Sequence, residues 1–114
     1  MYSATQAFIE WLTSNGYSAY SYPPKTGTEF FTVERTGGNV ADMVDHPEFA
    51  LQAWADTEAK AEEMCLDVRE MLASGDVPDG FYRAQPDSMY PWYDDSTRLP
   101  RYQLVLICTS QLTQ

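Results

Sequence analysis

The stretch FALQAWADTEAKAEEMCLDVREML, residues 49–72, carries the signals that decide the fold class. From Glu48 to Trp54, apolar side chains recur at every second position, which predicts a strand with one packed face and some cover on the other. Asp56 or Thr57 then offers a helix N-cap, and Ser74-Gly75 closes the segment. Between these caps the apolar positions form one stripe of a helix: Ala61, Met64, Cys65, Val68, Met71 and Leu72. A strand followed by an amphipathic helix indicates a domain of mixed α and β structure.

The C-terminal part of the sequence predicts two further strands separated by an irregular segment. One strand lies near Gly80 to Gln85, and the last runs from Arg101 to Ser110. Because Leu104 to Cys108 is a continuous apolar run, apolar on both faces, we expect the last strand to be central in the sheet. The segment between them, Pro86 to Pro100, is rich in aromatic and acidic residues and is expected to form a long loop.

The N-terminal part predicts a helix followed by a pair of strands. Ser3 and Gln6 have the spacing of a capping box, and Asn15-Gly16 ends the apolar helical period that follows. The Tyr-rich segment from Tyr17 to Tyr22 is expected to be the first strand, and Glu29 to Thr36 the second. Because these strands are separated only by a short proline- and glycine-containing turn, we expect them to form a hairpin.

The segment from Gly37 to His46 is expected to be an exposed loop. Its sequence, GGNVADMVDH, contains two glycines and several polar turn-forming residues, and it has no sustained hydrophobic period. Loops of this kind frequently contact partners, so this segment is a candidate for binding another protein.

Together these segments predict an α+β fold with the element order α-β-β-β-α-β-β. Each amphipathic helix needs a sheet face to cover, and both can pack on one face of a mainly antiparallel or mixed sheet of about four to five strands. The 114 residues are expected to form a single domain, residues 1–114, because a chain of this length builds one core of ordinary size.

The charge and the apolar content of the chain restrict its partners. The chain has 17 acidic and 7 basic side chains and a formal net charge of −10, which repels phosphate backbones and disfavours direct nucleic-acid binding. No apolar run approaches the roughly 20 residues of a membrane span, and the N-terminus lacks signal-peptide features, so we expect a soluble protein. Cys65 and Cys108 lack CxxC spacing and are expected to be buried free thiols.

The sequence offers little for catalysis or metal binding. Its one histidine, His46, lies near Asp42 and Asp45, which together could hold a divalent ion weakly, although such residues near a turn are far more often solvated. The acidic pair Asp94-Asp95, with Asp87 nearby, has the same two interpretations. We therefore expect no enzymatic activity and no cofactor.

An aromatic cluster, Tyr90, Trp92 and Tyr93, lies in the irregular segment before the last strand. Aromatic side chains that stack on bases normally have basic neighbours, whereas these are followed by Asp94 and Asp95. The prolines around the cluster favour an ordered loop. Its aromatic side chains pack either on their own domain or on a neighbouring protein, and the sequence leaves both interpretations open.

Three segments carry a resemblance to a known class of protein: TVERTGG at Thr32 to Gly38, the strand and helix at Phe49 to Leu72, and PRYQLVLICTS at Pro100 to Ser110. In this order they resemble the tail terminator, or tail-completion, proteins in the neck of long-tailed bacteriophages and prophages. The resemblance implies a homo-hexameric ring that sits on the tail tube, stops tube growth and offers the head connector a docking surface. It also implies the tail tube protein and the connector as partners, and a place in the virion tail or neck after synthesis in the bacterial host cytoplasm.

A ring component needs no catalytic group, but it must present two protein-binding faces. We expect the segments Gly37 to His46 and Asp87 to Leu99 to provide them. The candidate contact residues are Arg35, Asn39, Val40, Asp42, Met43, Asp45, Tyr90, Trp92 and Tyr93. Arg35 is the first candidate for an intersubunit salt bridge, and the alternative interpretation is an ordinary arginine at the edge of a sheet.

A second hypothesis is an acidic inhibitor that mimics nucleic acid and blocks a DNA-binding protein, which the small size and the net charge would suit. Such a mimic would spread carboxylates over one face. The predicted helix at residues 58–72 instead mixes Lys60 and Arg69 with its acidic residues, which favours the ring.

Overall fold

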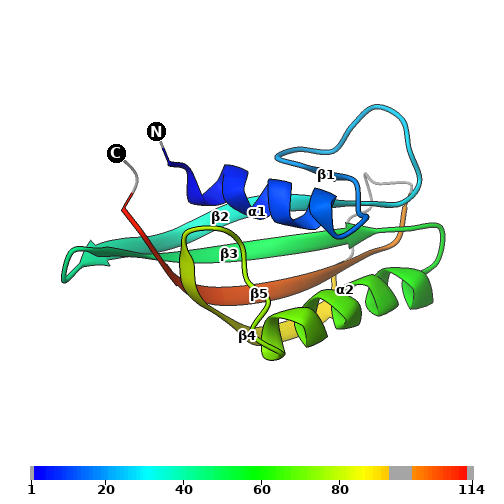
Figure 1. Cartoon of the computed structure of the whole chain (residues 1–114). Helices are drawn as coiled ribbons and strands as arrows, with labels where there is room; N and C mark the ends of the chain where they lie inside the picture. The colour runs from blue at the N-terminus through cyan, green and yellow to red at the C-terminus, as the bar shows by residue number, and fades with distance from the viewer. Residues whose placement is uncertain (1, 93–98, 113–114) are drawn as a thin grey trace.

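The computed structural model of the chain describes residues 2–92 and 99–112, which contain two helices and five strands. In chain order these are α1 (Ala4–Ser14), β1 (Ala19–Tyr20), β2 (Phe30–Ala41), β3 (Val44–Trp54), α2 (Glu58–Ala73), β4 (Phe81–Pro91) and β5 (Arg101–Ser110) (Figure 1). The predicted order α-β-β-β-α-β-β is therefore confirmed.

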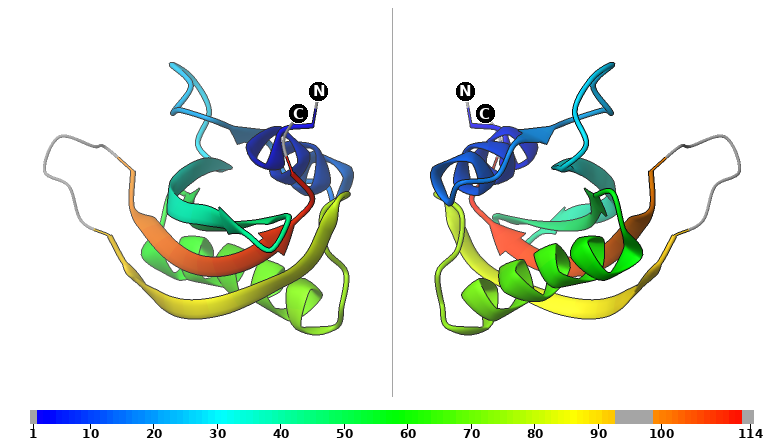
Figure 2. Two further views of the ribbon diagram at one scale, coloured as in Figure 1. Left: turned by 90° about the vertical axis from the view of Figure 1, so that its left-hand side faces the viewer. Right: turned by 90° about the vertical axis from the view of Figure 1, so that its right-hand side faces the viewer.

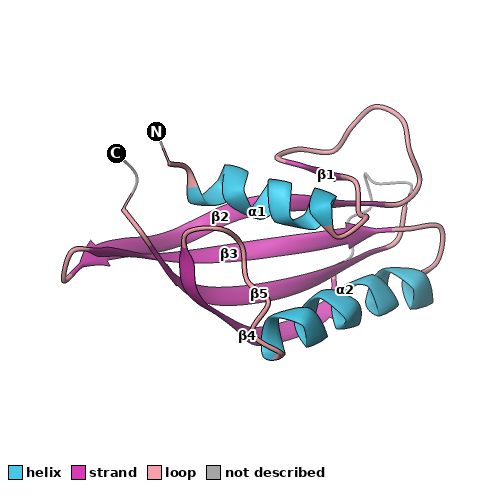
Figure 3. Cartoon of the chain, viewed as in Figure 1, coloured by secondary structure: helices cyan, strands magenta, loops and turns pink. Residues whose placement is uncertain are grey.

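The five strands form one mixed sheet in the order β1-β2-β3-β5-β4. β1 is parallel to β2, and the other neighbouring strands are antiparallel. β5 lies between β3 and β4, which confirms the central position predicted for the last strand. Both helices lie on the same face of the sheet, where α1 crosses the β2 side and α2 the β4 side (Figures 1 and 3). The fold is α+β, as predicted.

The core forms between this sheet face and the two helices. Phe49 and Leu106 face each other on β3 and β5, and both are fully buried together with Phe8 of α1 and Met64 of α2. The ring of Phe8 packs against that of Phe49 at a centroid distance of 5.5 Å. Side chains alternate between the two faces along each strand, which gives the sheet one apolar face. The apolar stripes of α1 and α2 pack on that face and bury it.

Both helices begin at an N-cap that the sequence predicts, although the Gln6 side chain donates to Glu10 rather than completing the capping box with Ser3. In α1 the Ser3 hydroxyl accepts a hydrogen bond from the backbone N–H of Gln6 at 3.2 Å. In α2 the cap is Thr57 rather than Asp56, because the Thr57 hydroxyl accepts from the backbone N–H of Lys60 at 3.1 Å. These contacts satisfy amide donors that have no partner within the first helical turn.

The predicted hairpin between residues 17–22 and 29–36 is wrong. The first strand is shorter than predicted and comprises only Ala19–Tyr20. It runs parallel to β2, with Ala19 opposite Phe31. The connection 21–29 stands away from the sheet (Figure 2), and it brings the chain back to the end at which β1 began (Figure 1). Its two prolines, Pro23 and Pro24, cannot form the two-residue turn that would join antiparallel strands.

The predicted loop from Gly37 to His46 is also wrong, because these residues extend β2 and β3 into a long hairpin. Pairing continues to Ala41 opposite Val44, and Asp42 and Met43 form the turn with φ angles of 55° and 67°. A two-residue hairpin turn with positive φ at both central residues is usually formed by Asn-Gly. Because Asp-Met is not such a pair, the sequence does not predict a turn here. We call residues 37–46 the arm; its tip extends past the end of β5 (Figure 1).

The glycines that suggested a loop serve the hairpin. Gly38 has φ +105°, and a Cβ atom there would lie 2.1 Å from the carbonyl oxygen of His46. The register shifts between Arg35 and Gly37, as in a β-bulge. The close approach of the two strands and the positive φ both require glycine. Gly38 therefore allows the hairpin to form and does not mark a loop.

The long loop expected from Pro86 to Pro100 begins instead as strand. β4 continues to Pro91, with register shifts near both Phe81 and Pro86, and it bends strongly together with β5 (Figure 2). Bulges increase strand curvature, and Pro86 lies on an edge strand, where a missing N–H donor is tolerated.

Candidate functional site

The predicted contact residues fall into two groups at opposite ends of the sheet. Those between Arg35 and Asp45 lie on the arm or at its base, whereas Tyr90 and Trp92 lie where β4 ends (Figure 1). Tyr93, like Asp94 and Asp95, lies outside the described residues. The two groups therefore lie on separate surfaces.

The base of the arm is fixed by an ion pair between Arg35 and Asp45. The two terminal guanidinium nitrogens donate to the two carboxylate oxygens at 2.7 Å each, and Nε donates to the Gly37 carbonyl oxygen at 3.0 Å. The Asp45 side chain is 4% exposed. Its hydrogen bonds with Arg35 lower the pKa of Asp45 despite burial, and they raise the pKa of Arg35.

This pair revises the role expected for Arg35. The arginine has a bidentate partner within its own chain, so it orients the arm relative to the core. An additional contact between Arg35 and a neighbouring subunit stays a prediction.

The tip of the arm exposes apolar side chains on a constrained backbone. Val40 is 61% exposed and Met43 is 81% exposed. Asn39 pairs with His46 across the hairpin, and Asp42 and Met43 hold left-handed φ angles. Non-glycine residues in that region cost about 1 to 2 kcal/mol each. Because strained non-glycine residues cluster at functional sites, the tip of the arm remains a candidate contact surface.

The Tyr90 and Trp92 surface is partly engaged by its own domain. The Tyr90 hydroxyl accepts a hydrogen bond from Nε2 of Gln103 at 2.7 Å. Trp92 remains 42% exposed, and the guanidinium of Arg101 lies 5.8 Å from its ring centroid and 4.6 Å from that of Trp54. Tyr90 therefore packs on its own domain, whereas Trp92 is only partly covered, by the Tyr90 ring at a centroid distance of 6.2 Å and by Arg101.

A row of hydrogen bonds that is not predictable from the sequence crosses the sheet face opposite the helices. Thr32, Gln52, Gln103 and Tyr90 are register partners on four neighbouring strands. The Thr32 hydroxyl donates to Gln52 at 2.6 Å, and the Gln52 amide donates to Gln103 at 2.9 Å. Trp54 Nε1 donates to Thr32 at 3.0 Å. Such a row fixes the register of the sheet on the face that no helix covers.

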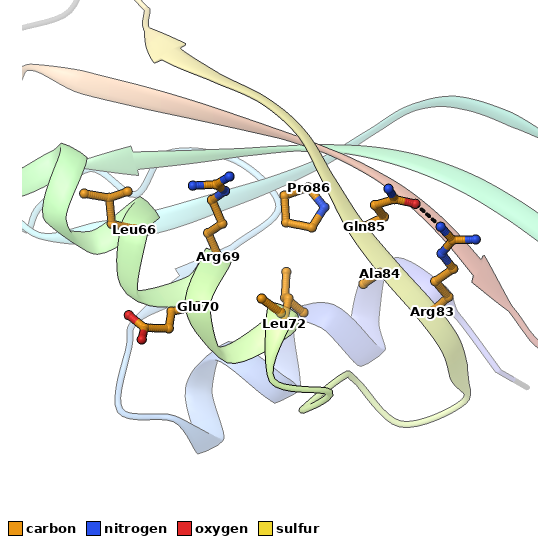
Figure 4. Close-up of a pocket in the computed structure, with 9 residues that line it drawn as sticks. Leu66, Arg69, Glu70, Leu72, Arg83, Ala84, Gln85 and Pro86 are labelled. Atoms are coloured by element: carbon orange, nitrogen blue, oxygen red, sulfur yellow. Dashed lines mark hydrogen bonds between the residues drawn. The ribbon is translucent and has the colours of Figure 1, made fainter.

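A groove between the C-terminal half of α2 and β4 was also not predicted. It has a volume of about 820 Å³ and is lined by Leu66, Arg69, Glu70, Leu72, Ala73, Arg83, Ala84, Gln85 and Pro86 (Figure 4). The sequence does not indicate that Arg69 and Arg83 lie close together. The pairing of β4 with β5 and the packing of α2 bring them to one groove.

The described residues contain no cluster of three or more His, Cys, Asp or Glu side chains that could hold a metal ion. Asp45, one of the three residues considered for a weak ion site, is paired with Arg35. Cys65 and Cys108 are buried and free, as predicted, and burial raises the pKa of each thiol to about 12. Thiols with so high a pKa are protonated at neutral pH and are poor nucleophiles.

A comparison of the sequence with known protein families and with characterised proteins finds no match. Within the described residues, neither helix has the length and apolar character needed to cross a membrane.

Proposed function

We propose that this protein is a structural component of phage tails, which caps the tail tube as a ring, ends tube polymerisation and offers the head connector a docking surface. The observation that carries this proposal is the arm. It extends past the core, its base is fixed by the Arg35–Asp45 pair, and its tip exposes Val40 and Met43. These are features of an assembly surface. The resemblance to tail terminators supplies the specific role.

The two sheet edges support assembly into a ring. β1 pairs with β2 only at Phe31 and Thr32, so the rest of the outer edge of β2 has no strand neighbour in the described chain. β4 forms the other edge. Unpaired edges at both sides of a sheet offer two different surfaces for contacts between copies, and head-to-tail contacts can close into a ring.

The alternative is an acidic inhibitor that occupies the nucleic-acid site of a DNA-binding protein. Its support is the formal net charge of −10. A mimic would act through a carboxylate-covered face and has no need of an apolar arm tip. An inhibitor would bind a basic protein as a monomer, whereas a tail component would self-assemble and would also bind the tail tube protein.

Assembly is expected to strengthen with salt. Six copies with a formal charge of −10 each place about −60 on one ring, so the subunits repel one another at low ionic strength. At about 0.15 M the screening length is about 8 Å, which removes long-range repulsion and spares contacts at the interface. Magnesium should act at lower concentration than sodium. Sedimentation across a series of both salts measures this, and assembly that weakens steadily with salt would contradict the repulsion argument.

Met43→Gly is expected to stabilise the fold and weaken assembly. Glycine adopts φ 67° without strain, so the free energy of unfolding should rise by up to about 1 kcal/mol, although glycine also loses more entropy on folding. The same change removes an exposed apolar side chain from the tip. Chemical denaturation and sedimentation of the variant test both effects. Met43→Leu keeps an apolar side chain under the same strain and serves as the control that still assembles. Unchanged assembly of Met43→Gly would show that the tip is not a contact.

A further inference from the structure

We propose that the arm tip of one copy seats in the groove between α2 and β4 of the next copy. This inference rests on the proposed ring and names the contact that builds it. The contact is heterologous, because the arm and the groove belong to different parts of the chain, and each copy uses both.

The groove has an apolar floor of a size suited to a few side chains. Leu72 and Ala84 are buried at its base, while Leu66 is 42% exposed on its α2 side. Its volume of about 820 Å³ lies within the range of sites that enclose ligands. Apolar side chains from a partner would remove this surface from water.

The rim of the groove is basic in a chain that is otherwise acidic. Arg69 and Arg83 stand on its two sides, with Leu72, Ala84 and Pro86 between them, and Glu70 points away from β4 (Figure 4). An adjoining cavity of about 220 Å³ shares Arg69 and contains Asp87, so the Arg83 side is the more positive.

These two arginines have no carboxylate partner in the part of the chain that the structure describes. Arg83 donates a hydrogen bond to the Gln85 side chain, and Arg69 makes no ion pair there. Arg35, by contrast, is paired with Asp45, and Lys60 lies near Glu29 and Glu63. The groove therefore carries positive charge that an acidic partner could neutralise.

The arm tip has the complementary chemistry. The Asp42 side chain is exposed, and its neighbours Val40 and Met43 are the exposed large apolar side chains of the arm. A carboxylate flanked by apolar groups matches an apolar floor between two guanidinium groups. The Arg35–Asp45 pair already holds the arm in place, which reduces the entropy lost when the tip binds.

Exchanging the charges tests this contact. Asp42→Arg and Arg83→Glu, each as the full-length chain, should weaken self-assembly by at least about tenfold, because each places like charges together. A mixture of the two variants should assemble again. The arginine-bearing tip of one variant then meets the glutamate-bearing groove of the other, and the unchanged tip meets the unchanged groove. The mixture should form rings in which the variants alternate.

The controls make the same charge changes at exposed positions away from both surfaces. Glu10→Arg matches the change at Asp42, and Lys25→Glu matches the change at Arg83. Sedimentation and mass of each variant, with thermal unfolding to verify folding, give the readout. Recovery in the mixture also shows that both variants are folded.

The outcomes separate this inference from the proposed function. If the unmodified chain forms rings and both single variants form them equally well, the arm–groove contact is wrong while the ring stands. If both variants fail and their mixture also fails, Asp42 and Arg83 do not face each other and the inference is overturned. If the unmodified chain never assembles, the proposed function fails and the contact with it.

Discussion

Leu106→Ala is expected to lower the free energy of unfolding by about 2 to 5 kcal/mol. Leu106 is fully buried on β5, the strand between β3 and β4, where it faces Phe49 and Pro86 on the two neighbouring strands. Truncation removes apolar contacts and leaves a cavity that a sheet covered by two helices cannot collapse to fill. Chemical denaturation at neutral pH measures the loss.

Ile107→Ala provides the matched control on the same strand. Ile107 is 46% exposed on the face that no helix covers, so its truncation should cost less than about 1 kcal/mol. A loss below about 1 kcal/mol for Leu106→Ala itself would contradict the central placement of β5 in the core.

Arg35→Ala is expected to cost about 3 kcal/mol at neutral pH. The variant leaves the carboxylate of Asp45, whose side chain is 4% exposed, without the guanidinium that neutralises it. The matched control is Lys60→Ala, which removes only half-exposed ion pairs at 3.6 and 3.9 Å and should cost about 0 to 1 kcal/mol.

The effect of Arg35→Ala should depend on pH. The pKa of Asp45 in the folded chain lies below its ordinary value, because Arg35 stabilises the carboxylate. The pair therefore contributes its full stability above the unfolded-state pKa of about 4, and this contribution disappears as pH falls through the lower folded-state pKa. Denaturation at a series of pH values should show the difference between the two proteins shrinking below about pH 4. A difference that stays constant to pH 2 would show that the ion pair does not stabilise the fold.

The sequence predicts best those elements whose apolar period and caps agree. In α2, the stripe through Met64 and Val68 and the cap at Thr57 all indicate one helix. The signal for β5 is equally clear, because the continuous apolar run from Leu104 to Cys108 predicts a central strand. In such segments local propensity and tertiary packing favour the same structure.

The arm could not be predicted because its signals conflict with its structure. Gly37 and Gly38 usually mark a loop, yet Gly38 here permits a close approach of two paired strands. The turn uses Asp42 and Met43 in place of the usual Asn-Gly. The parallel pairing of β1 likewise depends on contacts distant in sequence, such as the ring of Tyr17 packed edge-on against Phe31 at 5.1 Å.

The candidate site was predictable in part. The sequence predicts exposed positions for Val40 and Met43, and both are exposed, although on a hairpin rather than a loop. The groove was beyond sequence reasoning, because Arg69 and Arg83 come from different elements. Only the register of β4 and the orientation of α2 place them on one rim.

We propose that copies of this chain assemble into a closed ring, and the mass of the purified protein under native conditions tests this assembly. Native mass spectrometry, or particle images from electron microscopy at about 0.15 M salt, counts the copies. We expect a closed ring of six copies, in which each copy contacts two neighbours. A monomer at every protein concentration and every salt concentration would contradict it.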